Sequence, residues 1–204
     1  MNEFNERAKE WDANPMHLER STAIANALMA ALPDTSTMRL LDFGAGTGIL
    51  GGLLAPHCKE VVMMDNASGM VDVMKQKVVD RAWNNVVPVC HDLLAVDFEA
   101  EPFDCIVTQM VLHHIIDVTA LFHRFNHLLR VGGYLVIADL YAEDGSFHGE
   151  NFDGHLGFEQ HWLEGALRVE GFDPVSMAPC FVIRRQREGR EQEYPVFLSV
   201  SQKK

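Results

Sequence analysis

Two acidic residues and three glycines in the first third of the chain have the types and spacing of a nucleotide-binding site. Asp42 ends a short apolar run and is followed at alternate positions by Gly44, Gly46 and Gly48. This order predicts a strand, a tight turn and a helix N-terminus, where backbone N–H groups can approach a ligand closely because no Cβ intervenes. Asp65 ends the next apolar run, close to the offset of about 20 residues at which an acid accepts hydrogen bonds from ribose hydroxyls.

The spacing of the glycines argues against a dinucleotide fold. That fold requires G-x-G-x-x-G or its alanine variant, and here the third small position falls on Ile49. A carboxylate at Asp42 that faces the turn would repel a pyrophosphate, whereas it suits a ligand with a cationic amine. We therefore expect an adenosine with a positively charged tail, and a nicotinamide-dependent oxidoreductase is the less favoured alternative.

Three later strand ends add polar groups to the same edge of the predicted sheet. Asp92, Gln109 and Asp139 each lie at or just after the end of an apolar run. Ligands of doubly wound sheets lie outside the carboxyl ends of the strands, so these side chains should gather near the glycine turn. His113 and His114 are the first ionisable groups after Gln109.

The strands and helices that position these groups can be predicted from the apolar runs and helical periodicities of the sequence. The sequence predicts an N-terminal turn or short helix over 4–11, and helices over 18–32, 49–57, 68–81, 118–129 and 158–170. Glycines 132 and 133 are expected to cap the fourth of the long helices. Strands are predicted at 39–42, 60–65, 86–90, 103–109 and 134–139, with a terminal hairpin of 175–184 and 194–201 around a charged turn at 185–193. The polar, glycine-rich segment 142–157 has the character of a loop or lid.

Composition excludes several function classes. The chain has 204 residues, of which 48% are hydrophobic, and its formal net charge is −12. A negative chain repels a phosphate backbone, so we expect no nucleic-acid partner. No apolar run is long enough to span a bilayer, and the N-terminus lacks the pattern of a signal peptide. Four scattered cysteines fit a reducing compartment, and we expect a cytoplasmic protein without membrane partners.

In its ordered set of motifs, the chain resembles the class I S-adenosylmethionine-dependent methyltransferases. The resemblance is carried by 40–48, 65–70, 91–92, 103–104 and 129–133. It implies a Rossmann-like α/β fold, with a doubly wound, mostly parallel seven-stranded sheet, helices on both faces and a C-terminal antiparallel hairpin. It also implies S-adenosyl-L-methionine as cofactor and in-line transfer of a methyl group, and we expect a small-molecule acceptor.

The resemblance implies roles for individual residues. Met70 would lie against the adenine, although a core methionine is nearly as good an interpretation, and Asp92 would accept a hydrogen bond from the adenine amine or cap a helix. The full set expected to bind the cofactor is Asp42, Gly44, Ala45, Gly46, Gly48, Asp65, Asn66, Met70, Asp92, Leu93, Gln109 and Met110.

Histidines are the candidates for acid–base catalysis, because they titrate near working pH. The family often places a substrate-facing histidine just before a Gly-Phe pair, which favours His155; His113, His114 and Asp139 are further candidates. No metal is expected. His123 and His127 have the i, i+4 spacing that can bind a metal, but no third ligand is near them in the sequence. A metal site in the 142–157 segment and the helix after it is a minority interpretation, because its candidate ligands are irregularly spaced: His148, His155, His161, Glu150 and Asp153.

We expect one domain over 1–204 with three parts. Residues 1–33 form an N-terminal helical cap that either closes over the cofactor or simply packs on the domain. Residues 34–141 form the cofactor-binding core, and 142–204 contain the substrate lid, the last helix and the hairpin. A non-catalytic S-adenosylmethionine-binding sensor or partner subunit is the alternative to an enzyme. The acceptor atom and the oligomeric state are left open.

Overall fold

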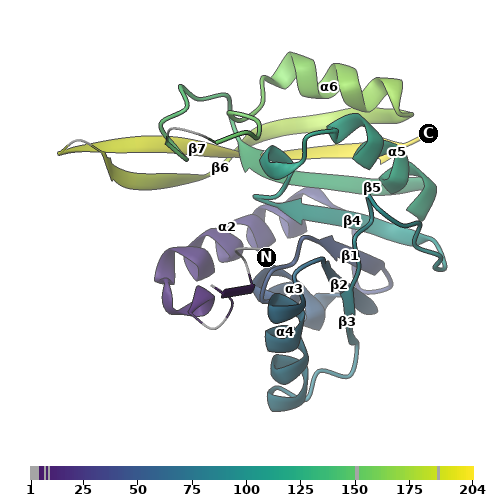
Figure 1. The fold of residues 1–204 in the computed structure, drawn as a ribbon. Coiled ribbons are helices and arrows are strands. Elements are labelled where there is room, and N and C mark those ends of the chain that lie inside the picture. Colours follow the sequence, from purple (N-terminus) through teal and green to yellow (C-terminus); the bar gives the residue numbers. More distant parts are fainter. Residues whose placement is uncertain (1–4, 7, 9, 150–151, 188) are drawn as a thin grey trace.

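Seven strands form one central sheet with the order β3-β2-β1-β4-β5-β7-β6 (Figure 1). The computed structural model describes residues 5–6, 8, 10–149, 152–187 and 189–204. The strands are β1 Arg39–Phe43, β2 Glu60–Asp65, β3 Val86–Cys90, β4 Phe103–Gln109, β5 Leu129–Leu140, β6 Phe172–Arg187 and β7 Arg190–Lys203. The first five strands are parallel, and β7 runs antiparallel to both β5 and β6. The predicted doubly wound sheet with a C-terminal antiparallel hairpin is confirmed.

Helices cover both faces of this sheet. They are α2 Pro15–Ala31, α3 Ile49–Leu54, α4 Ser68–Asp80, α5 Val118–Leu128 and α6 Gln160–Val169, with short 3₁₀ turns η1 Trp11–Ala13, η2 Ala55–His57 and η3 Leu112–His114. Side chains of α2, α3 and α4 share one buried cluster with the sheet, and side chains of α5 and α6 share the other. None of the described helices combines the length and the apolar character needed to cross a membrane.

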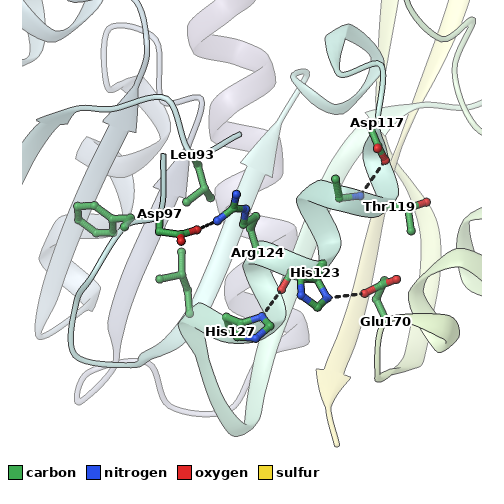
Figure 2. A pocket seen from close by; sticks show the side chains of 11 residues that line it. Leu93, Asp97, Asp117, Thr119, His123, Arg124, His127 and Glu170 are labelled. Atoms are coloured by element: carbon green, nitrogen blue, oxygen red, sulfur yellow. Dashed lines mark hydrogen bonds and ion pairs between the residues drawn. The ribbon is translucent and has the colours of Figure 1, made fainter. Parts of the chain in front are cut away.

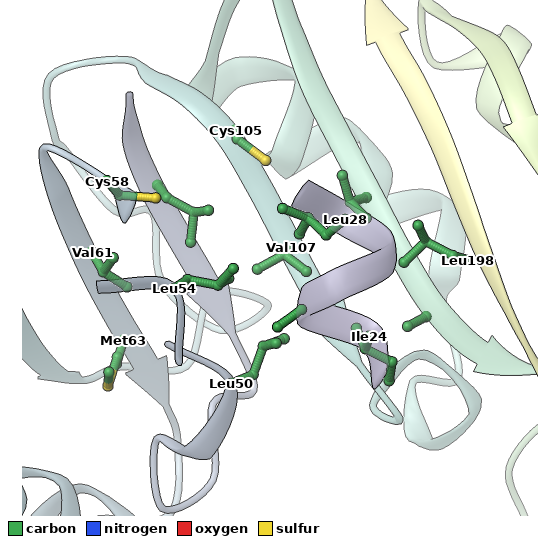
Figure 3. Close-up of a cluster of buried hydrophobic side chains, with 14 of the residues drawn as sticks. Ile24, Leu28, Leu50, Leu54, Cys58, Val61, Met63, Cys105, Val107 and Leu198 are labelled. Atoms are coloured by element: carbon green, nitrogen blue, oxygen red, sulfur yellow. The ribbon is translucent and has the colours of Figure 1, made fainter. Parts of the chain in front are cut away.

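The alternation of side chains along each strand divides the core between the two faces. Leu40 belongs to the cluster under α2 and α3, whereas Leu41 belongs to the cluster under α5 and α6. Val61 and Val62 divide in the same way on the neighbouring strand. Figure 3 shows the first of these clusters, in which Ile24 of α2 and other apolar side chains pack together. Strands buried on both faces explain the uninterrupted apolar runs of the sequence.

Two predicted boundaries were wrong in the second half of the chain. The helix before β5 ends at Leu128, and Gly132 and Gly133 lie within β5 instead of capping that helix. The charged segment 185–193 was expected to be the hairpin turn, but β6 continues to Arg187 and β7 begins at Arg190. Arg184 pairs across the hairpin with Glu193 at 2.9 Å, so opposite charges on facing strands extend the ladder.

The N-terminal segment lies against the glycine turn and α4. Phe4, part of the expected first turn, lies outside the described residues; the described turn is η1, and Asn14 caps α2 by accepting a hydrogen bond from Met16 N at 3.1 Å. Asp12 accepts a hydrogen bond from Thr47 Oγ1 at 2.6 Å and forms an ion pair with Lys77. These contacts hold the start of α2 beside the carboxyl edge of the sheet.

Candidate active site

The carboxyl ends of the parallel strands open onto a cavity of about 740 Å³. Its walls come from the β1 turn, from the ends of β2, β3 and β4, from η3 and from the start of α2. Every residue expected to bind the cofactor lines this cavity except Asp42 and Gly48. The fold therefore brings together side chains that are up to about 65 residues apart in the predicted set, as the strand-end argument requires.

The glycine turn and Asp65 form one hydrogen-bonded unit in the cavity wall. Asp65 Oδ2 accepts a hydrogen bond from Gly46 N at 2.8 Å, and Oδ1 accepts one from Ala67 N at 2.8 Å. Burial raises the pKa of Asp65, and these backbone hydrogen bonds oppose the rise. Gly46 has φ +58°, and the nearest atom to a Cβ added there would be Trp11 Nε1 at 4.0 Å. The turn thus presents bare backbone to the cavity.

Asp42 is buried behind the turn and does not line the cavity. Its side chain lies on the α3 face of the sheet, because Leu41 and Phe43 on either side point to the opposite face. Asp42 Oδ2 accepts a hydrogen bond from Gly51 N at 2.9 Å, and burial raises the pKa of this carboxyl to about 7. Gly48 caps α3 in the left-handed region, next to Met63, and also lies outside the cavity.

The geometry narrows the role of Asp92 and leaves both interpretations of Met70 open. Asp92 Oδ1 accepts hydrogen bonds from Leu94 N at 3.1 Å and Ala95 N at 3.2 Å, but these close a turn between β3 and β4 and no helix begins there, so the helix-cap interpretation was wrong. No described residue donates a hydrogen bond to its Oδ2, and Asp92 lines the cavity. Met70 is almost fully buried in a small cluster with Ala67, yet it also reaches the cavity wall.

Polar atoms without a described protein partner lie where β4 meets α2. Gln109 donates a hydrogen bond from Nε2 to Ser21 Oγ at 3.0 Å, but its buried Oε1 has no partner among the described residues. The Nε of Arg20, which precedes Ser21 in α2, is also buried without a hydrogen-bond partner among the described residues. Met110 follows with φ +55°, a strained conformation for a residue other than glycine. Orphaned polar atoms and backbone strain make this corner a candidate ligand-binding wall.

A histidine cluster forms the wall beyond β4. The imidazole of His113 is buried, with Nδ1 2.6 Å from Asp139 Oδ1, and the backbone N of His113 donates to Asp139 Oδ2 at 3.3 Å. His114 follows on η3, and His148 reaches the same wall from the loop after β5. Burial, followed by the nearby His113 and His114, lowers the pKa of His148 to about 4, so that His148 is neutral at pH 7.

His155, the favoured catalytic candidate, is not brought to the cavity. Its Nε2 lies 3.4 Å from the carbonyl oxygen of Ile116, and its ring packs near Phe158 and Trp162. The backbone N of His155 instead donates to the carbonyl oxygen of His113 at 2.8 Å. The loop that carries His155 turns away after this hydrogen bond, so its main chain supports the η3 turn while its side chain lies outside.

Several residues of the cavity were not among those expected to bind the cofactor or to act in catalysis: Trp11, His17, Arg20, Phe147, His148 and Arg185. Of these, the sequence argument had considered His148 only as a metal ligand of the lid. A signal existed for α2, because His17, Arg20 and Ser21 share the helical stripe of Ile24 and Leu28, and polar residues on a buried stripe mark a site. No comparable local signal exists for His148 and Arg185, which reach the cavity from a loop and from the hairpin.

A second hollow, of about 800 Å³, lies beside α5 and is shown in Figure 2. His127 Nδ1 lies 2.9 Å from the carbonyl oxygen of His123, and His123 Nδ1 lies 3.2 Å from Glu170 Oε2. Neither histidine belongs to a metal-binding group among the described residues. Of the minority lid set, only His148 belongs to a possible metal-binding group among the described residues, together with His113 and His114, and Glu150 lies outside those residues.

Comparison with known proteins agrees with this geometry. The model of the methyltransferase domain family matches residues 16–186. An uncharacterized methyltransferase of Schizosaccharomyces pombe is 36% identical over 158 residues, covering 72% of this chain and 52% of the relative. The chain spans about half or less of the length of this relative and of a Cellvibrio japonicus biotin-biosynthesis protein that it also matches. The chain belongs to the methyltransferase domain family.

Solved structures with low sequence identity share the fold. The N-methyltransferase NodS of Bradyrhizobium japonicum, in complex with S-adenosyl-L-homocysteine, has a TM-score of 0.68 at 22% identity, covering 94% of this chain and 89% of that one. An S-adenosylmethionine-dependent methyltransferase of Aquifex aeolicus has a TM-score of 0.72 at 16% identity, covering 96% and 97%. The family assignment agrees with the resemblance identified in the sequence, and so does the cofactor, S-adenosylmethionine.

Proposed function

We propose that this protein transfers the methyl group of S-adenosylmethionine to a small-molecule acceptor that carries an acidic or anionic oxygen. The observation that supports this most directly is the division of one cavity into two chemically different ends. Asp65 lies against the glycine turn with Asp92 on the neighbouring strand end, whereas His113, His114 and His148 cluster with Phe147 and Arg185. The first end suits an adenosine, and the second suits a negatively charged partner.

The residues present fit the cofactor. The bare turn at Gly46 leaves room for the ribose and the methionyl chain, and Asp65 offers carboxylate oxygens to ribose hydroxyls. The free Oε1 of Gln109 is a hydrogen-bond acceptor for the methionyl ammonium, and Arg20 is a cation for the methionyl carboxylate. Asp92 Oδ2 is the acceptor for the adenine amine.

The acceptor end favours an oxygen acid over an amine. Acidic residues of the lid, Glu143 and Asp144, are engaged locally, because Glu143 accepts a hydrogen bond from Phe147 N and Asp144 accepts one from Ser146 N. Neither of them lines the cavity. The guanidinium of Arg185 lies 3.7 Å from the ring centroid of Phe147, which gives the acceptor an apolar face beside a cation.

The protein's own contribution is alignment, exclusion of water and removal of a proton. S-adenosylmethionine supplies a methyl group on a sulfonium, which makes a protein nucleophile unnecessary. Alignment of two reacting groups is worth about 7–11 kcal/mol in favourable cases. Asp139 holds the Nδ1–H of His113, so the Nε2 of His113 can take the acceptor proton while Asp139 stabilises the resulting imidazolium.

Calorimetric titration with S-adenosylmethionine, followed by a metabolite screen with methyl-labelled cofactor, tests the proposal. Asp65→Ala should weaken cofactor binding by about tenfold or more, because the ribose acceptor and the tether of the glycine turn are both lost. Asp34→Ala is the control, since Asp34 only caps a surface turn at Ser36. Binding of NAD with no heat from S-adenosylmethionine would refute the proposal. Cofactor binding without turnover of any acidic acceptor would favour a sensor.

A further inference from the structure

Three histidines at the acceptor end of the cavity have the arrangement of a metal-binding group. One imidazole nitrogen from each of His113, His114 and His148 lies within 4.8 Å of the others. We propose that they bind one divalent transition-metal ion of the zinc type, with an open coordination position toward the methyl acceptor. The role of the ion in orienting the acceptor rests on the proposed function. A metal at this site would contradict the expectation from the sequence, which was that the protein binds none.

The separations are close to those of a formed site. Zinc binds histidine nitrogen at about 2.0–2.1 Å, which in a tetrahedron places the nitrogens about 3.3 Å apart. Contraction from 4.8 Å requires each nitrogen to move inward by about 1 Å. We expect rotation of the imidazole rings to supply this movement, since 4.8 Å is the upper limit of the separations.

Neighbouring groups already orient two of the three ligands. The Nδ1 of His113 is engaged by Asp139 at 2.6 Å, so Nε2 is the nitrogen available to a metal. In the metal-bound protein Nε2 would not take the acceptor proton, and the ion would instead favour loss of that proton by stabilising the anionic oxygen. A carboxylate that holds the second nitrogen of a histidine ligand is the usual outer partner in metal sites. The ring of His148 stacks on Phe152 with centroids 3.8 Å apart, and its Nε2 is buried without a hydrogen-bond partner among the described residues.

The donor set selects the kind of metal. Three imidazoles without a directly ligating carboxylate suit zinc, cobalt, nickel or copper, whereas magnesium and calcium prefer oxygen ligands. Three protein ligands leave a fourth position for water or substrate, as in catalytic zinc sites. Arg185 also lines this part of the cavity, and Asp139 is the carboxylate that the cluster contacts. An anionic acceptor oxygen at the fourth position would complete the charge balance.

The chain provides a matched control for the test. His123 and His127 are also a pair of neighbouring histidines, on the surface of α5 beside the second hollow (Figure 2). They have contacts with their own helix and with Glu170 instead of a third histidine. A His123→Ala/His127→Ala double variant therefore removes two imidazoles from the protein without touching the proposed site.

The experiment is a titration of the full chain, freed of any histidine tag, with Zn²⁺ and separately with Co²⁺. We expect one ion per chain, affinity reduced by about tenfold or more in His148→Ala, and unchanged affinity in the control. His114→Gln, also checked by circular dichroism, gives the same test if His148→Ala fails to fold. Co²⁺ should show the visible absorption of a low-coordinate site in the wild type and in the control.

The result that would overturn the inference is a wild-type protein without stoichiometric binding, or variants of His148 and His114 that bind as well as the wild type. S-adenosylmethionine is titrated into the same samples. Cofactor binding without metal binding would refute the metal site and leave the proposed function standing. Metal binding without cofactor binding would refute the proposed function alone.

Discussion

At the scale of single residues, Asp42 illustrates how one position can match a motif and yet face away from the ligand. Its carboxyl is buried against the N-terminus of α3 and accepts a hydrogen bond from Gly51 N. Because burial raises its pKa to about 7, the protonated form predominates in the folded protein below about pH 7. We infer that Asp42 supports the glycine turn from behind and acts on the cofactor only through that turn.

The raised pKa of Asp42 predicts a specific pH dependence. Between about pH 4 and pH 7 the folded state binds the Asp42 proton more tightly than the unfolded state, so this group's contribution to stability falls as pH rises. Asp42→Asn mimics the protonated form and removes that loss. The unfolding free energy of the variant should therefore gain on the wild type by up to about 1.4 kcal/mol per pH unit across this window. Urea denaturation at several pH values measures the difference.

A difference that stays constant with pH would contradict this assignment. Asp104→Asn is a useful comparison, because Asp104 is a partly exposed carboxylate that accepts a hydrogen bond from Arg39 N at 2.7 Å. Its variant should lose stability without the same rise between pH 4 and 7.

The histidines make a second prediction at this scale. His113→Gln should lower turnover by about a hundredfold, because the proton acceptor held by Asp139 is lost. His155→Gln should have a much smaller effect, since its side chain lies outside the cavity and only its backbone supports His113. Steady-state rates at saturating cofactor compare the two variants. Equal losses in both would return His155 to the catalytic set.

At the scale of elements, the loop after β5 is held in place by the hairpin. Arg185 and Arg187 of β6 donate hydrogen bonds to the carbonyl oxygen of Phe147 at 2.6 Å and 2.7 Å. Phe147 and His148 are the loop residues that line the cavity. The extension of β6 beyond its predicted end therefore shapes the cavity wall, because it carries both arginines to the loop.

Arg187→Ala should loosen this loop without changing the cofactor end. We expect faster hydrogen exchange over 144–149 and a several-fold higher KM for the acceptor, because the binding wall must be ordered when the acceptor binds. The affinity for S-adenosylmethionine should stay within about twofold, since Arg187 is not part of the cavity wall. Arg184→Ala, an exposed arginine on the same strand, is the matched control. A fall in cofactor affinity would show that the loop also covers the adenosine end.

At the scale of the whole molecule, the N-terminal segment and the carboxyl edge of the sheet together line the cavity. Trp11 and His17 approach the glycine turn from the N-terminal side, with ring centroids 4.5 Å apart, and Asp12 bonds to Thr47. This arrangement is compatible with both alternatives for the N-terminal segment, closure over the cofactor and simple packing on the domain. The division of 1–204 into cap, core and lid remains a prediction.

A bound product should therefore stabilise the entire fold. S-adenosylhomocysteine at about 100 times its Kd would add about 2.7 kcal/mol to the unfolding free energy, which corresponds to roughly 5–10 °C in Tm for a chain of this size. Differential scanning fluorimetry measures the shift, with NAD at equal concentration as the control. An equal shift with NAD would contradict the choice of cofactor.

The sequence by itself determined the order of the sheet's elements and most of the cavity wall that we assign to the cofactor, because strand, turn and helix N-terminus are contiguous in the chain and their pattern is local. The ends of β1 and β2 could therefore be predicted from Gly44, Gly46 and Asp65. Only the tertiary structure decided which face Asp42 occupies, since that depends on the packing of α3 against β1. The same holds for the histidine cluster, because His148 reaches His113 through a loop that the distant β6 hairpin fixes in place.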